Sequence, residues 1–251
     1  MFKASYITNI GKTSANQEDS ILFDHKVIQS NMKIAISKDF NTGEALFALS
    51  DGIAGLKYGE IASRKVLEYL EELVQDKFHN NSLMQCIKET QSKLVGLALN
   101  HAKYYGIGAT LAGIYFYGNE AHIFNVGDSR VYLFRDNILS LLSIDHTLAR
   151  KIIERGELPN EQSRAECYNQ LESAIIASVD EDDFEIHTQI ITMKPDDKFI
   201  ICSDGITDMI DDSLIENILQ KSLKIEESVQ NIFEQVLLKG EDNLSLIVIY
   251  C

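Results

Sequence analysis

Residues 109–126 read ATLAGIYFYGNEAHIFNV, two β-rich runs joined by the dipeptide Gly118-Asn119. A two-residue link of this kind between two such runs is a strong signal for a tight β-hairpin. Residues 130–142, RVYLFRDNILSLL, continue with a second hairpin around Asp136-Asn137. This part of the chain therefore predicts a four-strand meander and a fold built on antiparallel sheet.

The elements on either side of the meander fall into separate blocks of strands and helices. Apolar residues recur at three- and four-residue steps in two long segments, which predicts helices there. Separate blocks indicate an α+β fold, an antiparallel sheet pair with helices packed outside, rather than alternating βαβ units. The expected helices are 59–78, 84–104, 147–155, 213–221 and 226–239, and further strands are expected at 45–50, 186–193, 198–203 and 244–250.

Nothing in the sequence marks a domain boundary. The 251 residues include only two prolines, Pro159 and Pro195, and no low-complexity segment or linker. We therefore expect one domain over residues 1–251, a length that can bury a sizeable core.

Charge and composition exclude several classes of function. A net charge of −15 disfavours long contacts with a nucleic-acid backbone or an anionic membrane. No run approaches 18 apolar residues, and the N-terminus lacks the apolar stretch of a signal peptide. The four cysteines show neither a C-x-x-C pair nor zinc-ligand spacing. These features predict a soluble cytoplasmic protein that binds neither nucleic acid nor membrane, and they leave its oligomeric state open.

Several familiar catalytic motifs are absent from the sequence. Gly11-Lys12-Thr13 resembles the end of a phosphate-binding loop, but Tyr6 stands where that loop needs its first glycine. No cysteine is followed six residues later by arginine, as a cysteine-dependent phosphatase requires. The H-E-x-x-H and G-x-S-x-G patterns are missing as well.

Acidic residues stand instead beside glycine, or next to an apolar run, at the expected strand ends. A strand end fixes the position of its residue, and a neighbouring glycine lets backbone or solvent approach closely. Carboxylates brought together in this way repel one another unless cations neutralise them, which points to Mg²⁺ or Mn²⁺. Two such ions about 3.5–4 Å apart would hold a shared water as hydroxide and clamp a phosphoryl group. The residues concerned are Glu18-Asp19, Asp51-Gly52, Gly127-Asp128, Asp204-Gly205 and Asp242.

Seven ordered stretches resemble the PPM family, the 2C-type metal-dependent protein serine/threonine phosphatases, and above all its compact bacterial members. The resemblance covers almost the whole chain and implies a four-layer α-β-β-α sandwich with two central antiparallel sheets. The stretches are GKTSANQEDS (11–20), ALFALSDGIAGLKYGEIAS (45–63), GIGATLAGIYF (106–116), FNVGDSRVYLFRDN (124–137), LLSIDHTLARKIIERGEL (141–158), FIICSDGITDMI (199–210) and GEDNLSLIVI (240–249).

The same resemblance implies a reaction and a set of site residues. Family members hydrolyse phosphoserine and phosphothreonine in proteins, by direct attack of a water held between two Mn²⁺ or Mg²⁺ ions. The substrate would be a phosphorylated protein, the product of a serine/threonine kinase in bacterial signalling. Carried over by motif, the catalytic residues are Asp51, Asp204 and Asp242. Asp51 would bridge both ions, Gly52 (through its carbonyl oxygen) and Glu18 would each contact one ion, Asp204 and Asp242 would hold the other, Asp19 would support these ligands, and Asp128 matches the position of a third, looser ion.

The chain departs from the family pattern in the residues around the metal site. Ser14 stands where members usually carry an arginine that binds the substrate phosphate, and a hydroxyl cannot replace that bidentate contact. Leu56 ends the stretch DGIAGL, where bacterial relatives usually carry histidine. The histidine that other branches place beside the metal aspartate as the proposed general acid is also missing. Lys12, Lys57 and Arg64 are candidates for a compensating positive charge near the phosphate.

The segment of about residues 145–184 is expected to form the flap beside the active site, which shapes substrate choice in the family. Over 157–184 it lacks the basic residues expected around a groove that binds phosphoproteins. Arg130 is interpreted as a partner in a structural ion pair or hydrogen bond, and Thr110 and Ser129 as packing and hydrogen-bonding residues rather than catalysts.

Three functions are compatible with these residues. The first is an active phosphoprotein phosphatase, since all five main metal positions are present. The second is a regulatory module that keeps the fold and the metals but binds a phosphoprotein or partner without turnover. The absence of a positive side chain near the phosphate position would favour it. The third is a phosphohydrolase acting on small molecules, which would have a closed pocket rather than an open cleft.

Overall fold

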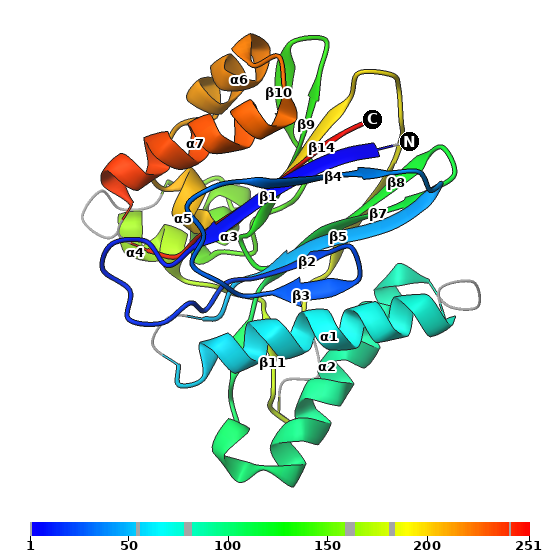
Figure 1. Ribbon diagram of the computed structural model, residues 1–251. Helices are drawn as coiled ribbons and strands as arrows, with labels where there is room; N and C mark the ends of the chain where they lie inside the picture. The colour runs from blue at the N-terminus through cyan, green and yellow to red at the C-terminus, as the bar shows by residue number, and fades with distance from the viewer. Residues whose placement is uncertain (1, 54–55, 78–81, 159–163, 181–183, 241) are drawn as a thin grey trace.

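Two antiparallel six-stranded sheets lie face to face, and helices cover both outer faces (Figure 1). The computed structural model describes residues 2–53, 56–77, 82–158, 164–180, 184–240 and 242–251. The expected α+β fold with its α-β-β-α layers is confirmed.

The first sheet brings the two ends of the described chain side by side. Its middle strands pair antiparallel with a register that runs from Lys3 opposite Tyr250 to Asn9 opposite Leu244. In spatial order the strands are β10 (Ile138–Leu141), β9 (Arg130–Arg135), β13 (Lys198–Cys202), β14 (Leu244–Tyr250), β1 (Phe2–Asn9) and β4 (Ile36–Phe40).

The second sheet contains the first hairpin of the meander. Its register pairs Leu111 with Val126 and Tyr117 with Glu120, so the chain turns at Gly118-Asn119 as expected. In spatial order the strands are β12 (His187–Thr192), β8 (Glu120–Val126), β7 (Leu111–Tyr117), β5 (Glu44–Ser50), β2 (Ser20–Phe23) and β3 (Lys26–Ile28).

The meander itself is divided between the two sheets, which corrects the expectation of four neighbouring strands. β7 and β8 lie in the second sheet, whereas β9 and β10 lie in the first. The chain crosses from one sheet to the other at Gly127, whose φ of +97° is a left-handed conformation that glycine adopts readily. β8 and β9 are each almost entirely buried, since one of their faces meets the opposite sheet and the other meets helices or the flap.

Helices pack on the outer face of each sheet through apolar residues spaced three or four positions apart. In α1 these include Val66, Leu67 and Leu70, all fully buried. α1 (Gly59–Lys77) and α2 (Leu83–Asn100) cover the second sheet, and α6 (Asp212–Lys221) and α7 (Ile225–Lys239) cover the first.

Most predicted helices are confirmed, but the second long one is shorter than expected. α2 ends at Asn100, and His101 leaves the helical conformation with φ −141° and ψ 88°. A separate 3₁₀ turn, η1 (Ala102–Tyr104), follows it. β1 to β4 are not among the strands that the sequence pattern specifies.

The core has three apolar layers, of which the one between the sheets is rich in aromatic rings. Phe47 and Phe116 lie there with ring centroids 6.0 Å apart and nearly perpendicular planes. Full burial of one such side chain contributes about 1.5–3 kcal/mol. The two sheets are therefore held face to face, and the positions of their strand ends relative to one another are fixed.

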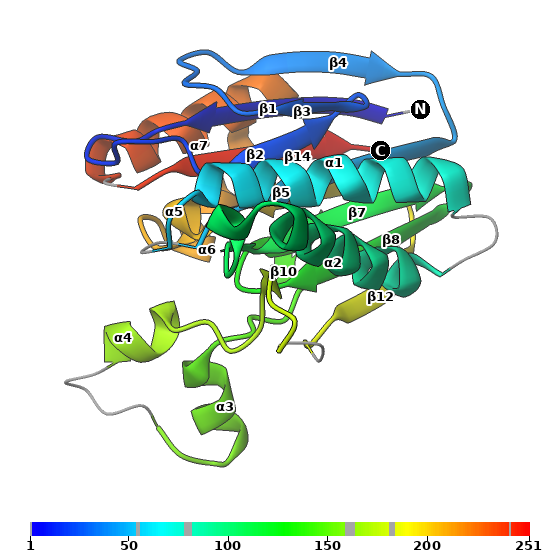
Figure 2. The same cartoon turned by 90° about the horizontal axis from the view of Figure 1, so that it is seen from below.

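The segment between β10 and β12 lies at one end of the sandwich. It contains α3 (Leu148–Glu154), α4 (Arg164–Asn169) and β11 (Ile175–Ile176), and β11 pairs with β6 (Gly108–Ala109). Figure 2 shows α3 and α4 standing off from the layers. Residues 159–163 and 181–183 of the expected flap lie outside the described residues.

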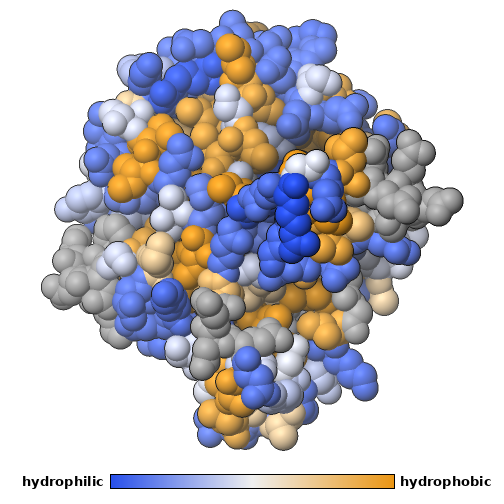
Figure 3. All heavy atoms as spheres, turned by 180° about the vertical axis from the view of Figure 1, so that it is seen from behind, coloured by the Kyte–Doolittle hydropathy of each residue, from blue (hydrophilic) through white to orange (hydrophobic). Residues whose placement is uncertain are grey.

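The surface mixes apolar and polar side chains. Figure 3 shows apolar residues gathered in patches that hydrophilic residues interrupt. None of the described helices combines the length and the apolar composition that crossing a lipid bilayer needs.

Gly205 marks a close approach between two parts of the chain. It belongs to the short helix α5 (Asp204–Thr207), which starts directly after β13. A Cβ atom at Gly205 would lie 1.9 Å from the carbonyl oxygen of Asn243, just before β14. Only glycine therefore lets these two segments meet.

We expect Gly205→Ala to lower the free energy of unfolding, because the added methyl group forces the two segments apart. Overpacking of this kind costs about 1–3 kcal/mol or more. Gly96→Ala in α2 is the matched control: its Cβ would meet nothing within 4 Å. Alanine is about 1 kcal/mol more favourable than glycine in a helix, so this control should be neutral or stabilising. Urea unfolding of both variants tests this, and equal effects would contradict it.

Candidate active site

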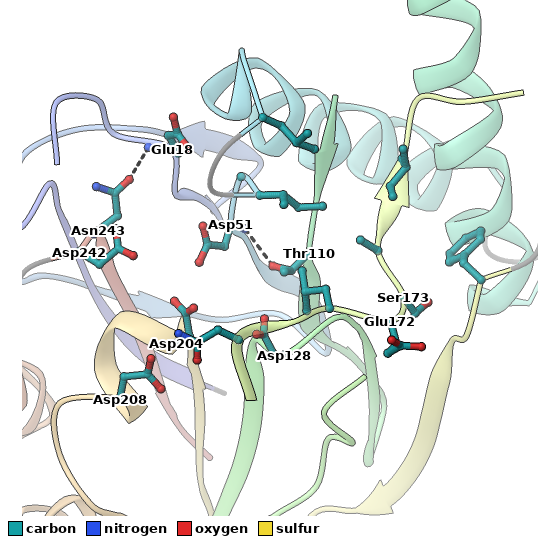
Figure 4. Close-up of a pocket in the computed structure, with 18 residues that line it drawn as sticks. Glu18, Asp51, Thr110, Asp128, Glu172, Ser173, Asp204, Asp208, Asp242 and Asn243 are labelled. Carbon is teal, nitrogen blue, oxygen red and sulfur yellow. Dashed lines mark hydrogen bonds between the residues drawn. The ribbon is translucent and has the colours of Figure 1, made fainter. Parts of the chain in front are cut away.

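Seven carboxylates line one cavity of about 690 Å³ at the end of the sandwich where strands of both sheets terminate (Figure 4). Leu56, Asp208 and Asp242 on its rim are exposed, so it opens to solvent. The carboxylates are Glu18, Asp51, Asp128, Glu172, Asp204, Asp208 and Asp242.

Asp51 follows directly after the buried strand β5 and is held by Thr110. The Asp51 backbone N–H donates to Thr110 Oγ1 at 3.0 Å, and the Thr110 N–H donates to the Asp51 carbonyl oxygen at 2.8 Å. The Thr110 hydroxyl also lies 2.7 Å from Ser129 Oγ. Thr110 and Ser129 thus act as hydrogen-bonding residues, as expected, and fix where the Asp51 carboxylate stands.

Gly52 and Glu18 meet at the start of α1. The Gly52 N–H donates to the Glu18 carbonyl oxygen at 3.2 Å. A Cβ on Gly52 would lie 2.5 Å from the Gly59 backbone, and one on Gly59 would lie 2.6 Å from Glu18 Oε2. Two glycines therefore let the Glu18 carboxylate come within reach of the segment that carries Asp51.

Asp204 and Asp242 come from neighbouring strands of the first sheet. Asp204 begins α5 after β13, and Asp242 lies two residues before β14. Because Gly205 packs against Asn243, the two carboxylates are brought to the same edge of the cavity. Asp242 Oδ1 accepts from its neighbour's backbone, Asn243 N, at 2.7 Å.

Asp19 is fully buried behind these residues and does not line the cavity. Its Oδ2 accepts a hydrogen bond from Ser203 Oγ at 2.9 Å, whereas its Oδ1 has no hydrogen-bond partner. It thus contacts the serine that precedes Asp204, which agrees with its expected supporting position.

Asp128 lies on the link where the chain crosses between the sheets. The preceding Gly127 is fixed by His146 from the start of the flap segment: Gly127 N–H donates to His146 Nδ1 at 3.0 Å, and His146 N–H donates to the Gly127 carbonyl oxygen at 3.0 Å. Asp128 therefore faces the cavity from a braced turn.

In this cavity each carboxylate disfavours the ionised form of its neighbours. Burial raises the pKa of Asp51 well above its ordinary value, and the charges of Asp19 and Asp204 raise it further. Burial, together with the charge of Asp208, raises the pKa of Asp204 to about 6. The pKa of Asp128 is raised in the same direction by burial and by the charge of Asp204. A cation would relieve all of these repulsions.

The donor set fits a hard, oxygen-binding cation. As the side chains stand, no three His, Cys, Asp or Glu side chains within the described ranges form a ready-made cluster that could hold a metal ion. Mg²⁺ usually keeps several waters and takes only one or two carboxylates directly, so widely set carboxylates suit it. A bound cation would lower the raised pKa of Asp51 and offset the negative charge near the buried Asp19 Oδ1, which has no hydrogen-bond partner.

The described residues that line this cavity include no Lys, Arg or His. The Ser14 hydroxyl donates to Asp242 Oδ1 at 3.0 Å. It therefore contacts a carboxylate, whereas the arginine expected at this position would bind the substrate phosphate. Lys12 Nζ donates to the Leu238 carbonyl oxygen at 2.9 Å, and Arg64 donates to Gln29. Neither these two cations nor Lys57 replaces the missing arginine at the cavity wall.

Arg130 forms the expected structural ion pair. Its Nη2 lies 2.6 Å from Asp145 Oδ2, and its Nε donates to both oxygens of the same carboxylate. This bidentate contact ties the start of β9 to the flap segment.

Three residues near the site were not predicted from the sequence. Asn243 clamps the loop that carries Glu18: its Nδ2 donates to the carbonyl oxygens of Ile10 and Asn16, both at 3.0 Å, and its Oδ1 accepts from Glu18 N at 2.5 Å. Asp208 lies one helical turn after Asp204, a spacing that could have signalled it. Glu172 comes from the flap segment, where no local pattern distinguishes it.

Comparison with known proteins agrees with this geometry. The sequence model of a family described as "Protein phosphatase 2C" matches residues 34–242. The serine/threonine protein phosphatase PstP of Mycobacterium tuberculosis is 28% identical over 210 residues, which are 82% of this chain and 40% of that protein. The serine/threonine phosphatase stp of Listeria monocytogenes is 26% identical over 216 residues, 82% of this chain and 84% of that protein. The chain therefore spans less than half the length of the mycobacterial relative.

A solved structure shares the fold over the whole chain. The catalytic domain of PstP, crystallised in complex with two manganese ions, has a TM-score of 0.78 and 25% identity, and the match covers 100% of this chain and 99% of that one.

We expect Asn243→Ala to destabilise the protein and to loosen the loop at Glu18, because three backbone groups lose their partner. Each buried group left unpaired costs about 1–3 kcal/mol. Asn100→Ala is the matched control, since its side chain makes one exposed hydrogen bond, to the Gly96 carbonyl oxygen. Thermal unfolding should show a much larger loss for Asn243→Ala, and hydrogen exchange should be faster around Glu18. Similar losses in both variants would contradict the clamp.

Proposed function

This chain belongs to the protein phosphatase 2C family, and from that premise we propose that it hydrolyses phosphoserine and phosphothreonine in proteins with the help of bound divalent cations. The observation that carries the proposal is the convergence of Asp51, Asp204 and Asp242, from strands of both sheets, on one open cavity. The proposal treats residues 1–251 as one catalytic domain.

The proposed metal ligands are those that the family resemblance implies, and the shared cavity of their side chains supports them. Asp51 would contact two ions. Gly52 (through its carbonyl oxygen) and Glu18 would each contact one ion, and Asp204 and Asp242 would hold the other. Bound Mn²⁺ or Mg²⁺ would supply Lewis acidity toward the phosphoryl oxygens and lower the pKa of the attacking water. Asp128 is the proposed ligand of a third ion.

The chain's own residues have distinct tasks in this proposal. Thr110 holds Asp51 from the backbone side, and Ser203 orients Asp19 behind the ligands. The exposed rim lets a segment of a protein enter, which supports a phosphoprotein over an enclosed small molecule as substrate. We propose a substrate phosphorylated by a serine/threonine kinase, in the cytoplasm.

A second function is favoured by one observation. Among the described residues that line the cavity there is no Lys, Arg or His. Phosphate capture would then depend on the ions alone, and no cationic side chain would protonate the leaving alkoxide. A module that binds a phosphoprotein without turnover is compatible with such a site.

We expect Mn²⁺-dependent hydrolysis of p-nitrophenyl phosphate, and slower hydrolysis of a phosphothreonine peptide. A missing general acid costs about 10²–10⁴ in rate for a poor leaving group and far less for an aryl phosphate. EDTA and Asp204→Asn should abolish both activities. Asp211→Asn, an exposed aspartate outside the cavity, is the matched control and should leave both unchanged. Metal binding by calorimetry without turnover of either substrate would leave the binding module as the function.

Metal addition should also stabilise the fold. We expect Mn²⁺ to raise the melting temperature, because a ligand at 100 times its Kd stabilises the folded state by about 2.7 kcal/mol. Asp204→Asn removes one repelling charge, so its metal-free form should melt above the wild type while gaining less from Mn²⁺. Scanning calorimetry with Mn²⁺ and with EDTA measures both effects, and Asp211→Asn should follow the wild type. An equal Mn²⁺ gain in all three proteins would refute the assignment of Asp204 as a ligand.

A further inference from the structure

An apolar wall occupies the part of the cavity that the carboxylates leave free. Two of its residues, Ile53 and Leu56, follow Asp51 on the link to α1, and the others come from the segment after α4. The wall consists of Ile53, Leu56, Leu171, Ala174, Ile176 and Phe184. We propose that it binds an aliphatic or aromatic side chain next to the phosphoresidue, and so selects the substrate; this inference rests on the proposed phosphatase function.

The wall is held at a fixed place relative to Asp51 by the short strand β6. Ile53 N–H donates to the Gly108 carbonyl oxygen at 3.1 Å, and Gly52 forms a bridge with Ala109. A Cβ on Gly108 would lie 2.8 Å from Ile53 Cδ1 and 3.1 Å from Ile176 Cγ1. Both isoleucines thus pack over the strand that also positions the aspartate.

The far side of the wall belongs to the flap segment, and hydrogen bonds within that segment hold it in place. Leu171 forms a bridge with Thr147, and the next residue, Glu172, donates its N–H to the His146 carbonyl oxygen at 2.9 Å. Ser173 Oγ accepts from Glu185 N at 2.8 Å, which holds the chain next to Phe184. Hydrogen bonds to neighbouring segments therefore fix the backbone that carries the wall.

Part of the wall's apolar surface is accessible to solvent, although Phe184 also packs against the core under α1 and α2. Leu56 is 40% exposed, and Ile53, Leu171, Ile176 and Phe184 are half-buried. Leu56 follows Asp51 by five residues and lines the same cavity as that acid.

The size of the cavity determines which part of the substrate meets the wall. At about 690 Å³ it has room for more than a phosphate and one short side chain. If the phosphate lies over the carboxylates and their ions, the residues beside the phosphoresidue come within reach of the wall, since successive residues of an extended chain advance only about 3.3 Å. Burying an apolar side chain there removes it from water, and one apolar contact in such a pocket discriminates between substrates about 10-fold to 200-fold.

The test compares phosphothreonine peptides that differ only in the residues beside phosphothreonine, carrying leucine, phenylalanine or serine before or after it. We expect kcat/KM with Mn²⁺ to be at least 10-fold higher for one apolar peptide than for its serine counterpart. In Leu56→Ser and Phe184→Ser this ratio should fall toward one, whereas Leu56→Met should keep it. Leu99→Ser, on an exposed face of α2, is the matched control and should keep the wild-type ratio.

A binding measurement separates this inference from the proposed function. Non-hydrolysable phosphonate versions of the same peptides, labelled for fluorescence anisotropy, should show the same ratio in dissociation constants. Hydrolysis of p-nitrophenyl phosphate with equal use of all peptides would overturn the inference and leave the phosphatase in place. No hydrolysis of any substrate would overturn the phosphatase, and the phosphonate ratio alone would then decide whether the wall binds an apolar side chain. If the ratio between apolar and serine peptides is unchanged in Leu56→Ser and Phe184→Ser, the inference that the wall selects the substrate is also overturned.

Discussion

Repulsion among partly buried carboxylates at one end of the sandwich is the constraint on which the arrangement of the site depends. Asp51, Asp128 and Asp204 all have raised pKa values, chiefly because burial removes them from water and their neighbours carry the same charge. Such a cluster persists only where the surrounding fold supplies enough stability. Here the two sheets supply it, with an aromatic layer between them and helices on both sides. The proposed cations would neutralise this repulsion by binding between the carboxylates.

The scaffold positions the acids largely by fixing the backbone that carries them, through hydrogen bonds from side chains on other segments. Thr110 fixes the backbone at Asp51, and Asn243 joins the loop of Glu18 to the start of β14. Glycines at 52 and 205 allow chain segments to meet at distances that no other residue permits. The strands and these contacts together set where each acid stands, which lets several like charges converge on one cavity.

The chain combines this shared scaffold with substitutions that alter what surrounds the phosphate. Ser14 contacts Asp242 instead of offering an arginine, and Leu56 joins an apolar wall. Under the functions proposed above, both residues would make recognition depend on ions held by the carboxylates and on apolar contact with the substrate. Two of the described arginines bond to other side chains: Arg64 donates to Gln29, and Arg130 to Asp145.

The sequence by itself determined the α+β class, the first hairpin, most helices, and five of the seven acids that line the cavity, because apolar periodicity and acid–glycine pairs are local signals. It did not specify that the meander divides at Gly127, since apolar runs buried on both faces fit either sheet. It did not specify β1, whose pairing with β14 joins residues almost a whole chain apart. The three hydrogen bonds of Asn243, and the presence of Leu56 and Phe184 in the lining of one cavity, were decided only by tertiary structure. These contacts join segments that no periodicity links, so only the packed fold brings them together.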